Sequence, residues 1–231
     1  MGMTSGRVRG VIFDFDGVLV DSEPTRFKAG AQALAEVGVS LTWVRFLSVW
    51  LGRTDAAGLR EILGERYDAE YARVVARRNV LYEKWLDDVP PFADAIAFLG
   101  HISSGIRLAV ATGSRRVEVE RILARLRWHR RFQTLVTAED YRRAKPDPEP
   151  FLTAARGLDL PPASCLVIED SPAGVAAAEA AGMPVLAVDR GRVPAGLDQA
   201  TWLVESLEAL TLTVSGGVLV RAEGEQEAPR L

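Results

Sequence analysis

Residues 11–22 read Val-Ile-Phe-Asp-Phe-Asp-Gly-Val-Leu-Val-Asp-Ser, and this stretch decides the fold. Its apolar start is typical of a buried strand, which runs directly into Asp14 and Asp16, followed by Gly17. Side chains two residues apart on an extended chain point the same way. Ligands of open α/β sheets bind outside the carboxyl ends of the strands, so we expect both carboxylates to face a ligand. The alternative, an aspartate that only caps a turn before Gly17, accounts for one carboxylate and not for two.

Further short apolar runs alternate with longer helical patterns along the chain. Including the first, the predicted strands are residues 8–13, 106–111, 134–137, 165–168 and 184–188. Strands that alternate with helices are typical of a parallel sheet, and nearly continuous apolar strands indicate helices on both faces. We therefore predict a doubly wound, Rossmann-like α/β core. One helix is expected to end near Ser104-Gly105 and another to begin at Ser171-Pro172.

Residues 23–89 show apolar side chains every three or four positions and no strand pattern. This predicts a small all-helical domain, inserted after the first strand, that lies as a cap over the sheet edge. Pro90 and Pro91 end its last helix and form a stiff hinge. The core would then comprise residues 1–22 and 90–231, of which 222–231 have little to bury and are expected to form a flexible tail.

A second pair of acids, Glu169 and Asp170, follows the apolar run at 165–168. Taken alone, Asp170 reads as a helix N-cap. If it shares a crevice with Asp14 and Asp16, these carboxylates repel one another, and Mg²⁺ is the simplest ion to hold them. The sequence therefore predicts a metal site formed by Asp14, Asp16 and Asp170, with Glu169 close by.

Two more strand ends carry groups that complement an anion. Thr112 offers a hydroxyl, and Gly113 lets backbone N–H groups approach an anion closely. Lys145, on a proline-rich loop, offers a positive charge. Each has an ordinary alternative, a strand-end turn or a solvated lysine, but their placement at successive strand ends favours a phosphate-binding role. Arg115 is a secondary candidate, with a solvated helix start as its alternative.

Composition excludes several classes of partner. The chain has 28 lysines and arginines against 31 aspartates and glutamates, a net charge of −3 that gives no reason to bind nucleic acid or an anionic membrane. The arginine-rich run 121–131 is interpreted as a solvated helix face. Cys165 is the single cysteine, so no intrachain disulfide can form, and a cytoplasmic location is expected. We expect a small-molecule partner, no signal peptide or transmembrane helix, and a monomer or a small homo-oligomer.

The candidate residues fall in four ordered motifs: D-x-D-G-V-L-V-D-S-E from Asp14, A-T-G-S from Ala111, K-P-D-P from Lys145 and I-E-D-S from Ile168. These resemble the motifs of the haloacid dehalogenase superfamily. The chain is similar to the branch with a helical cap after the first motif, which includes phosphoglycolate phosphatases, sugar-phosphate phosphatases and β-phosphoglucomutases.

The resemblance implies roles for individual residues. Asp14 would be the nucleophile that becomes an aspartyl phosphate, and Asp16 the general acid and base. Mg²⁺ would be held by the Asp14 carboxylate, the Asp16 backbone carbonyl and Asp170, with Glu169 nearby. Thr112 and Lys145 would bind the phosphoryl oxygens.

Two positions bear on the type of reaction. Family dehalogenases and phosphonate hydrolases lack an acid at the position of Asp16, so its presence favours phosphate-ester chemistry. β-Phosphoglucomutases carry a cap histidine where this chain has Arg26, which cannot readily shuttle a proton because its pKa lies above about 12. We therefore predict a Mg²⁺-dependent phosphatase for a small phosphorylated metabolite. A phosphosugar mutase and a non-catalytic phosphate-metabolite-binding module are the alternatives.

Overall fold

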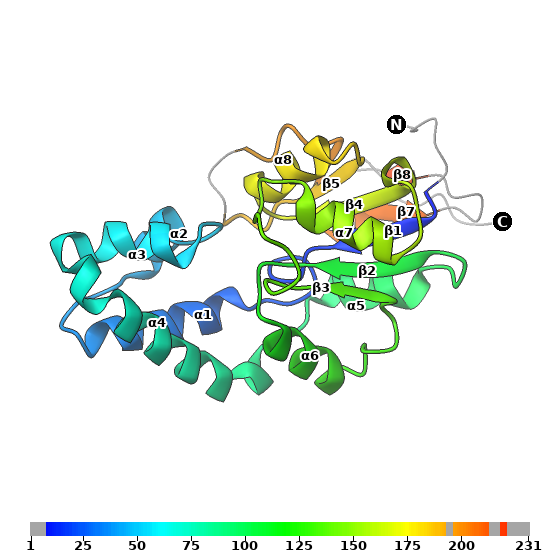
Figure 1. The fold of residues 1–231 in the computed structure, drawn as a ribbon. Coiled ribbons are helices and arrows are strands. Elements are labelled where there is room, and N and C mark those ends of the chain that lie inside the picture. Colours follow the sequence, from blue (N-terminus) through cyan, green and yellow to red (C-terminus); the bar gives the residue numbers. More distant parts are fainter. Residues whose placement is uncertain (1–7, 193–195, 213–217, 221–231) are drawn as a thin grey trace.

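The computed structural model describes residues 8–192, 196–212 and 218–220 of the 231-residue chain (Figure 1). The tail expected at residues 222–231 lies outside the described residues. Within the described ranges, no helix combines the length and the apolar character needed to cross a membrane.

Six parallel strands form the central sheet. They are β1 (Gly10–Phe13), β2 (Arg107–Ala111), β3 (Thr134–Val136), β4 (Cys165–Glu169), β5 (Val185–Val188) and β6 (Trp202–Val204). Their order in space is β3-β2-β1-β4-β5-β6. The chain builds the sheet outward to one side of β1 and then to the other, so the strand order reverses at β1 and β4. In open α/β sheets this reversal is where ligands bind.

Helices cover both faces of the sheet, which confirms the doubly wound prediction. They are α5 (Ala93–His101), α6 (Arg116–Arg125), α7 (Glu149–Gly157) and α8 (Pro172–Ala180), with 3₁₀ turns at Pro162–Ser164 and Leu207–Ala209. Val11 and Phe13 of β1 belong to the apolar cluster that includes Phe98 of α5 and Ile122 of α6. The intervening Ile12 belongs to the second cluster, with residues of α7 and α8.

All five predicted strands are present, with small shifts at their ends. Strand β6 and the antiparallel pair β7 (Leu210–Leu212) and β8 (Val218–Val220) were not predicted. Each has three residues, too few for an alternating pattern; β3 is equally short and was predicted only from the apolar run at 134–137.

The end of α5 and the start of α8 test two further expectations from the sequence. Helix α5 ends at His101, before Ser104-Gly105, because Ile102 already has an extended backbone (φ −66°, ψ 130°). At α8 the predicted start is confirmed: the Ser171 hydroxyl accepts from the Gly174 amide. The N-cap is therefore Ser171, and the capping interpretation of Asp170 is wrong.

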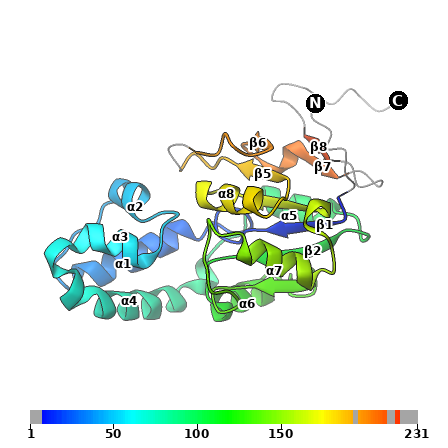
Figure 2. The same ribbon diagram turned by 45° about the horizontal axis from the view of Figure 1, so that its top comes forward.

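Four helices at one end of the sheet form the cap (Figures 1 and 2). They are α1 (Glu23–Ala35), α2 (Trp43–Val49), α3 (Asp55–Leu63) and α4 (Tyr67–Lys84), with 3₁₀ turns at Gly64–Arg66 and Leu86–Asp88. The buried Trp50 ring packs against Gly30 and Gly58, where a Cβ atom would lie 2.8 Å and 2.7 Å from it. Glycine at these two positions lets the cap helices approach closely.

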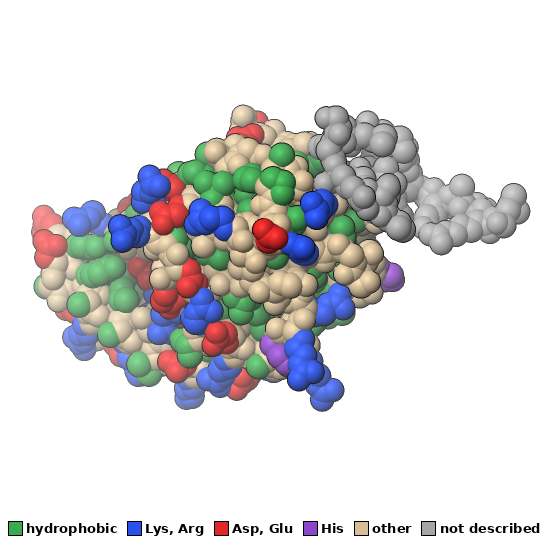
Figure 3. All heavy atoms as spheres, turned by 45° about the vertical axis from the view of Figure 1, so that its right-hand side comes forward, with side chains coloured by type: hydrophobic (Ala, Val, Ile, Leu, Met, Phe, Trp, Pro, Cys, Tyr) green, Lys and Arg blue, Asp and Glu red, His purple; other side chains and the backbone are tan. Residues whose placement is uncertain are grey.

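The arginines of residues 121–131 do more than face solvent. Arg121 is ion-paired with Asp87 beside the cap hinge, at 2.6 Å. Arg125 and Arg131 donate to the carbonyl oxygens of Val89 and Leu99. On the face drawn in Figure 3, basic and acidic side chains are interspersed, and no single-sign stripe is visible there.

Candidate active site

The candidate residues lie at the carboxyl ends of three neighbouring strands. Asp14 follows β1, Thr112 follows β2, and Glu169 is the last residue of β4. Because β2, β1 and β4 are adjacent and parallel, these groups meet at one edge of the sheet. Lys145 arrives from the loop between β3 and α7.

Lys145 connects two of the predicted carboxylates. Its Nζ lies 2.5 Å from Asp14 Oδ1 and 2.6 Å from Glu169 Oε1, and it donates to the carbonyl of Ala111 at 3.0 Å. Its side chain is 12% exposed. Burial opposes the charge of Lys145, but Asp14 and Glu169 outweigh it and raise the lysine's pKa above its ordinary value. The lysine is therefore a fixed cation beside Asp14.

The environment of Asp14 is short of positive charge. Burial raises the pKa of Asp14 to about 7, Lys145 opposes this rise, and the charges of Glu169 and Asp16 add to it. A second cation close to Asp14 would favour its ionised, nucleophilic form.

Asp14 and Asp16, which the extended-strand argument expects to face one ligand, have different partners in the structure. Strand β1 ends at Phe13, and the chain turns tightly, with the Leu19 and Val20 amides donating to the Phe15 carbonyl. The Asp16 carboxylate binds Arg26 of the cap and Ser114 after β2, whereas the Asp14 carboxylate binds Lys145.

Asp16 is held by one guanidinium and two hydroxyl groups. Arg26 Nη2 lies 3.1 Å from each Asp16 oxygen, Ser22 Oγ donates to Oδ1 at 2.5 Å, and Ser114 Oγ donates to Oδ2. Burial would raise the pKa of Asp16, but these partners lower it below its ordinary value. Asp16 is thus ionised, with both oxygens engaged.

Glu169 has both oxygens engaged by protein groups. Oε1 binds Lys145, while Oε2 accepts from the Asp170 amide at 2.8 Å and from the Ser171 amide and hydroxyl at 2.9 Å. A Cβ atom at Gly174 would lie 1.8 Å from the Glu169 carboxyl carbon, so a glycine is needed there. This geometry orients Lys145 and the start of α8, and both Glu169 oxygens already accept from protein groups.

Asp170 differs from the other acids because none of the ion pairs among the described residues includes it. Burial raises its pKa well above the ordinary value, and the charges of Glu169 and Asp14 raise it further. It lies against Gly17, where a Cβ atom would come within 1.8 Å of Asp170 Oδ2. The carboxylate therefore sits beside the Asp14–Gly17 segment and is suited to a cation.

The described residues hold no group of three Asp, Glu, His or Cys side chains placed to bind a metal by themselves. The donors that fit an oxygen-seeking cation are two carboxylates, Asp14 and Asp170, together with backbone carbonyls and water. A Mg²⁺ ion usually keeps several waters and needs only one or two carboxylates, so this set is sufficient.

Thr112, Gly113 and Ser114 line the end of β2. Thr112 is 1% exposed, and its hydroxyl accepts from the Ser114 amide at 3.1 Å. Gly113 carries no Cβ, and the nearest atom that one would meet, Tyr141 Oη, is 3.9 Å away. Arg115 is directed to the first turn of α6, where its Nε donates to Glu118 Oε1 at 2.7 Å.

Three further residues contribute to the site and were not predicted. Ser22 and Ser114, which stand at the ends of their motifs, both donate to Asp16. Arg190 had no signal: it donates to the Gly17 and Val18 carbonyls at 3.0 Å and 3.3 Å and is ion-paired with Asp94 at 2.8 Å. It braces the turn after Asp16.

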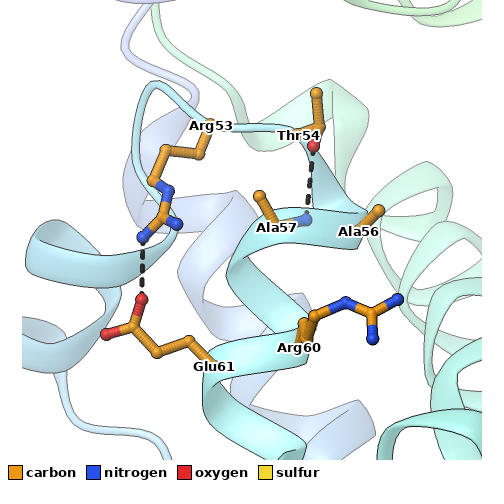
Figure 4. A pocket seen from close by; sticks show the side chains of 6 residues that line it. All are labelled: Arg53, Thr54, Ala56, Ala57, Arg60 and Glu61. Carbon is orange, nitrogen blue, oxygen red and sulfur yellow. Dashed lines mark hydrogen bonds and ion pairs between the residues drawn. The ribbon is translucent and has the colours of Figure 1, made fainter.

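A shallow hollow of about 550 Å³ lies elsewhere, on the cap. It is lined by Arg53, Thr54, Ala56, Ala57, Arg60 and Glu61 (Figure 4). Arg53 and Glu61 form an ion pair of 2.9 Å across it. None of the predicted catalytic, phosphate-binding or metal residues lines this hollow, so we base the candidate site on the strand-end cluster.

Comparison with known proteins agrees with the fold and the motifs. Residues 11–188 match the family model described as haloacid dehalogenase-like hydrolase. The chain is 31% identical over 218 residues to hexitol phosphatase A of Escherichia coli, which covers 93% of this chain and 100% of that protein. It is 30% identical to the β-phosphoglucomutase of Bacillus subtilis, over 83% of this chain and 88% of that one.

Solved structures give the same result. The β-phosphoglucomutase of Clostridium difficile superposes with a TM-score of 0.75 and 25% identity, over 87% of this chain and 92% of that chain. A phosphoglycolate phosphatase-like protein of Lactobacillus plantarum superposes with a TM-score of 0.78 and 22% identity, over 86% and 95% of the two chains. The chain therefore belongs to the haloacid dehalogenase-like hydrolases.

Proposed function

We propose that this chain is a Mg²⁺-dependent phosphatase that hydrolyses a small phosphorylated metabolite, of the sugar-phosphate or phosphoglycolate class, through an aspartyl phosphate on Asp14. Its family and its phosphatase relatives make it a phosphoric monoester hydrolase. The observation that carries the proposal is Lys145, a buried cation 2.5 Å from the Asp14 carboxylate at the strand ends where a ligand is expected.

Asp14 is proposed to attack the phosphorus atom and to take over the phosphoryl group. Lys145 and the Thr112 hydroxyl offer charge and a hydrogen bond to the phosphoryl oxygens, which lowers the repulsion between two anions. Burial would raise the pKa of Asp16, but Arg26 lowers it in the arrangement described, so the acid step requires that Arg26 first release Asp16 and that Asp16 take up a proton from water. Asp16 then gives this proton to the leaving oxygen as the phosphorus–oxygen bond breaks. Asp16 then accepts a proton from the water that hydrolyses the aspartyl phosphate, which restores both aspartates and releases phosphate.

The metal would be held by the Asp14 and Asp170 carboxylates and the Asp16 backbone carbonyl, with Glu169 acting through Lys145 and the start of α8. When bound, Mg²⁺ supplies positive charge to the reacting phosphoryl group. The support is the Asp170 carboxylate, which has no ion-pair partner within the described part of the chain, and the raised pKa values of Asp14 and Asp170. We also propose a cytoplasmic location, in keeping with a single buried cysteine, Cys165.

A phosphosugar mutase is the second candidate, favoured by the similarity to β-phosphoglucomutases. Arg26 replaces the cap histidine of those enzymes, and its guanidinium binds Asp16 without being able to relay a proton. We therefore place the phosphatase first. A non-catalytic binding module is less well supported, because it has no use for an acid at Asp16.

The test is release of inorganic phosphate from a panel of sugar phosphates, phosphoglycolate and nucleotides, with Mg²⁺ and with a chelator. Asp14→Asn should abolish release and retain measurable phosphate-ester binding, while Asp68→Asn, at an exposed position on the cap, should match the unaltered enzyme. Release that survives Asp14→Asn contradicts the proposed nucleophile. No release by the folded unaltered protein would direct attention to a mutase that needs a bisphosphate activator, or to a binding module.

A further inference from the structure

Arg26 lies where the cap meets the core. It belongs to cap helix α1, yet its Nη2 lies 3.1 Å from each oxygen of Asp16 and donates to Ser114 Oγ at 2.6 Å. Its guanidinium carbon is 4.6 Å from the ring centre of Tyr82 on cap helix α4. One side chain therefore joins two cap helices to the proposed general acid.

In this arrangement Asp16 is not free to react. Ser22 and Arg26 occupy Oδ1, and Ser114 and Arg26 occupy Oδ2, which leaves no oxygen open to a leaving group or a water. The two hydroxyl groups can rotate away at little cost. Arg26 is only 19% exposed, and a guanidinium that leaves its carboxylate inside a protein needs another anion. Arg26 therefore releases Asp16 most readily when another anion binds to its guanidinium group.

Two further arginines, Arg78 and Arg115, lie near Arg26. Arg78, on α4, has a side chain that is 12% exposed and pairs with Asp55, and its Nε is buried with no acceptor among the described residues. Tyr82, one turn along α4, has a buried hydroxyl that likewise lacks a partner within the described chain. Burial lowers the pKa of Arg78, and the charges of Arg26 and Arg115 lower it further, in keeping with three neighbouring guanidinium groups.

The acids of this region are already engaged. Glu118 is 5% exposed and lies 2.7 Å from Arg115 and 3.8 Å from Arg26, while Asp55 accepts from Arg78 and from the Trp50 indole N–H. The buried Arg78 Nε–H and the Tyr82 hydroxyl remain as unused donors. A planar guanidinium fork binds a carboxylate or a phosphate through two parallel hydrogen bonds, which a neutral hydroxyl cannot match in charge or geometry.

We propose that Arg26 and Arg78 form a second anion site, and that the favoured substrate carries a carboxylate or a second phosphate away from its transferred phosphoryl group. When this group binds, it replaces Asp16 as the partner of Arg26, and the Asp16 carboxylate becomes free to react. The inference rests on the proposed phosphatase function, and it favours acidic phosphate esters over the phosphates of neutral polyols.

The test compares kcat and KM for phosphoglycolate, a sugar bisphosphate and a hexitol monophosphate. The unaltered enzyme should turn over one or both of the acidic esters with a kcat/KM at least about tenfold above that for the hexitol ester, since tenfold corresponds to about 1.4 kcal/mol. Arg26→Gln and Arg78→Gln should each reduce this preference about tenfold, mainly through KM for the acidic ester. Arg26→Lys should retain part of it, because it keeps the charge without the fork.

Arg77→Gln is the matched control, because Arg77 precedes Arg78 on the same helix and forms an exposed ion pair with Glu36 at 2.9 Å. Comparison of phosphoglycolate with the bisphosphate identifies which anion the site takes. Equal turnover of acidic and neutral esters by the unaltered enzyme overturns the inference, even if a variant fails to fold. An equal loss of kcat/KM for all three esters in both glutamine variants also overturns the inference. If no ester is hydrolysed by the folded unaltered protein, the proposed function itself fails.

Discussion

Lys145 Nζ and Asp14 Oδ1 lie 2.5 Å apart although 131 positions separate the two residues in the chain. The same ammonium group lies 2.6 Å from Glu169. The two flanking carboxylates fix the lysine beside the proposed nucleophile. Adjacent parallel strands β1 and β4 bring the two carboxylates together, and the loop between β3 and α7 brings Lys145 to them.

Lys145→Met should lower kcat/KM for phosphate release by about 10²–10³, because the phosphoryl oxygens and Asp14 lose a charge placed in a water-poor site. Lys145→Arg should recover little of this loss, since a planar fork does not fit a position built for a compact ammonium. Steady-state kinetics of both variants provide the measurement. An active Lys145→Met enzyme would remove Lys145 from the proposed site.

Gly17→Ala should destabilise the fold and impair activity, because its new Cβ atom would overlap the Asp170 carboxylate at 1.8 Å and because φ is +82°. Gly38→Ala is the matched control: φ is +73° there, but nothing lies within 4 Å of the added atom. The control should cost only the conformational strain, about 1 kcal/mol. Denaturant unfolding and phosphate release measure the two effects, and equal behaviour of the variants would contradict the close approach of Asp170 to Gly17.

Asp170→Asn should remove the effect of Mg²⁺ on thermal stability. An ion that binds only the folded state raises the melting temperature with its concentration, and Asp170 is the proposed ligand without another cation. We expect Mg²⁺ to raise the melting temperature of the unaltered protein and of an Asp198→Asn control, and to leave Asp170→Asn unchanged. A full Mg²⁺ response in Asp170→Asn would place the ion elsewhere.

Glu23→Gln should stabilise the protein at pH 8 and have little effect at pH 5. Burial raises the pKa of Glu23 from its ordinary 4.5 to about 7, with Asp16 adding to the rise. Between these two values the folded state holds a proton that the unfolded state has lost, so the free energy of unfolding decreases as pH rises through this window. The loss is on the order of 2–3 kcal/mol. Unfolding of Glu23→Gln and of the exposed control Glu65→Gln at both pH values tests it, and a gain that is the same at pH 5 and pH 8 would rule out the titration of Glu23.

Asp94→Asn should destabilise the protein at neutral pH by about 3 kcal/mol, because it leaves the buried Arg190 without its carboxylate. Burial raises the pKa of Asp94, but Arg190 and the Leu207 amide outweigh this and hold it below its ordinary value. The contribution of Asp94 is therefore complete above pH 4 and declines as pH falls through the lower folded pKa. Urea unfolding at pH 7 and near pH 2, well below the ordinary carboxyl pKa, provides the measurement. A cost that persists unchanged at the lower pH would show that the loss is not electrostatic.

The local sequence predicted the five strands β1 to β5 and the candidate residues that follow them. Apolar runs such as Val11–Phe13 are buried on both sides by any doubly wound sheet, so they identify the core strands without a structure. Polar residues that directly follow such runs, including Asp14, Thr112 and Glu169, must lie at the ligand-binding edge, because all strands of a parallel sheet end there. The cap was visible for a similar reason, since helical periodicity is a local property.

Only the tertiary structure decided which of these groups face one another. Asp16 pairs with Arg26 and Asp14 pairs with Lys145, and no spacing rule in the sequence predicts these partners. Glu169 and Asp170 are neighbouring acids in the sequence, yet the Glu169 oxygens bind Lys145 and the Ser171 amide, while Asp170 pairs with no cation among the residues that the structure describes. The sequence identifies which side chains lie at a strand end, because the position of a strand follows from the local pattern of apolar residues. Their pairing depends on contacts between segments as distant as α1, β1 and the Lys145 loop, and therefore emerges only when the chain is packed.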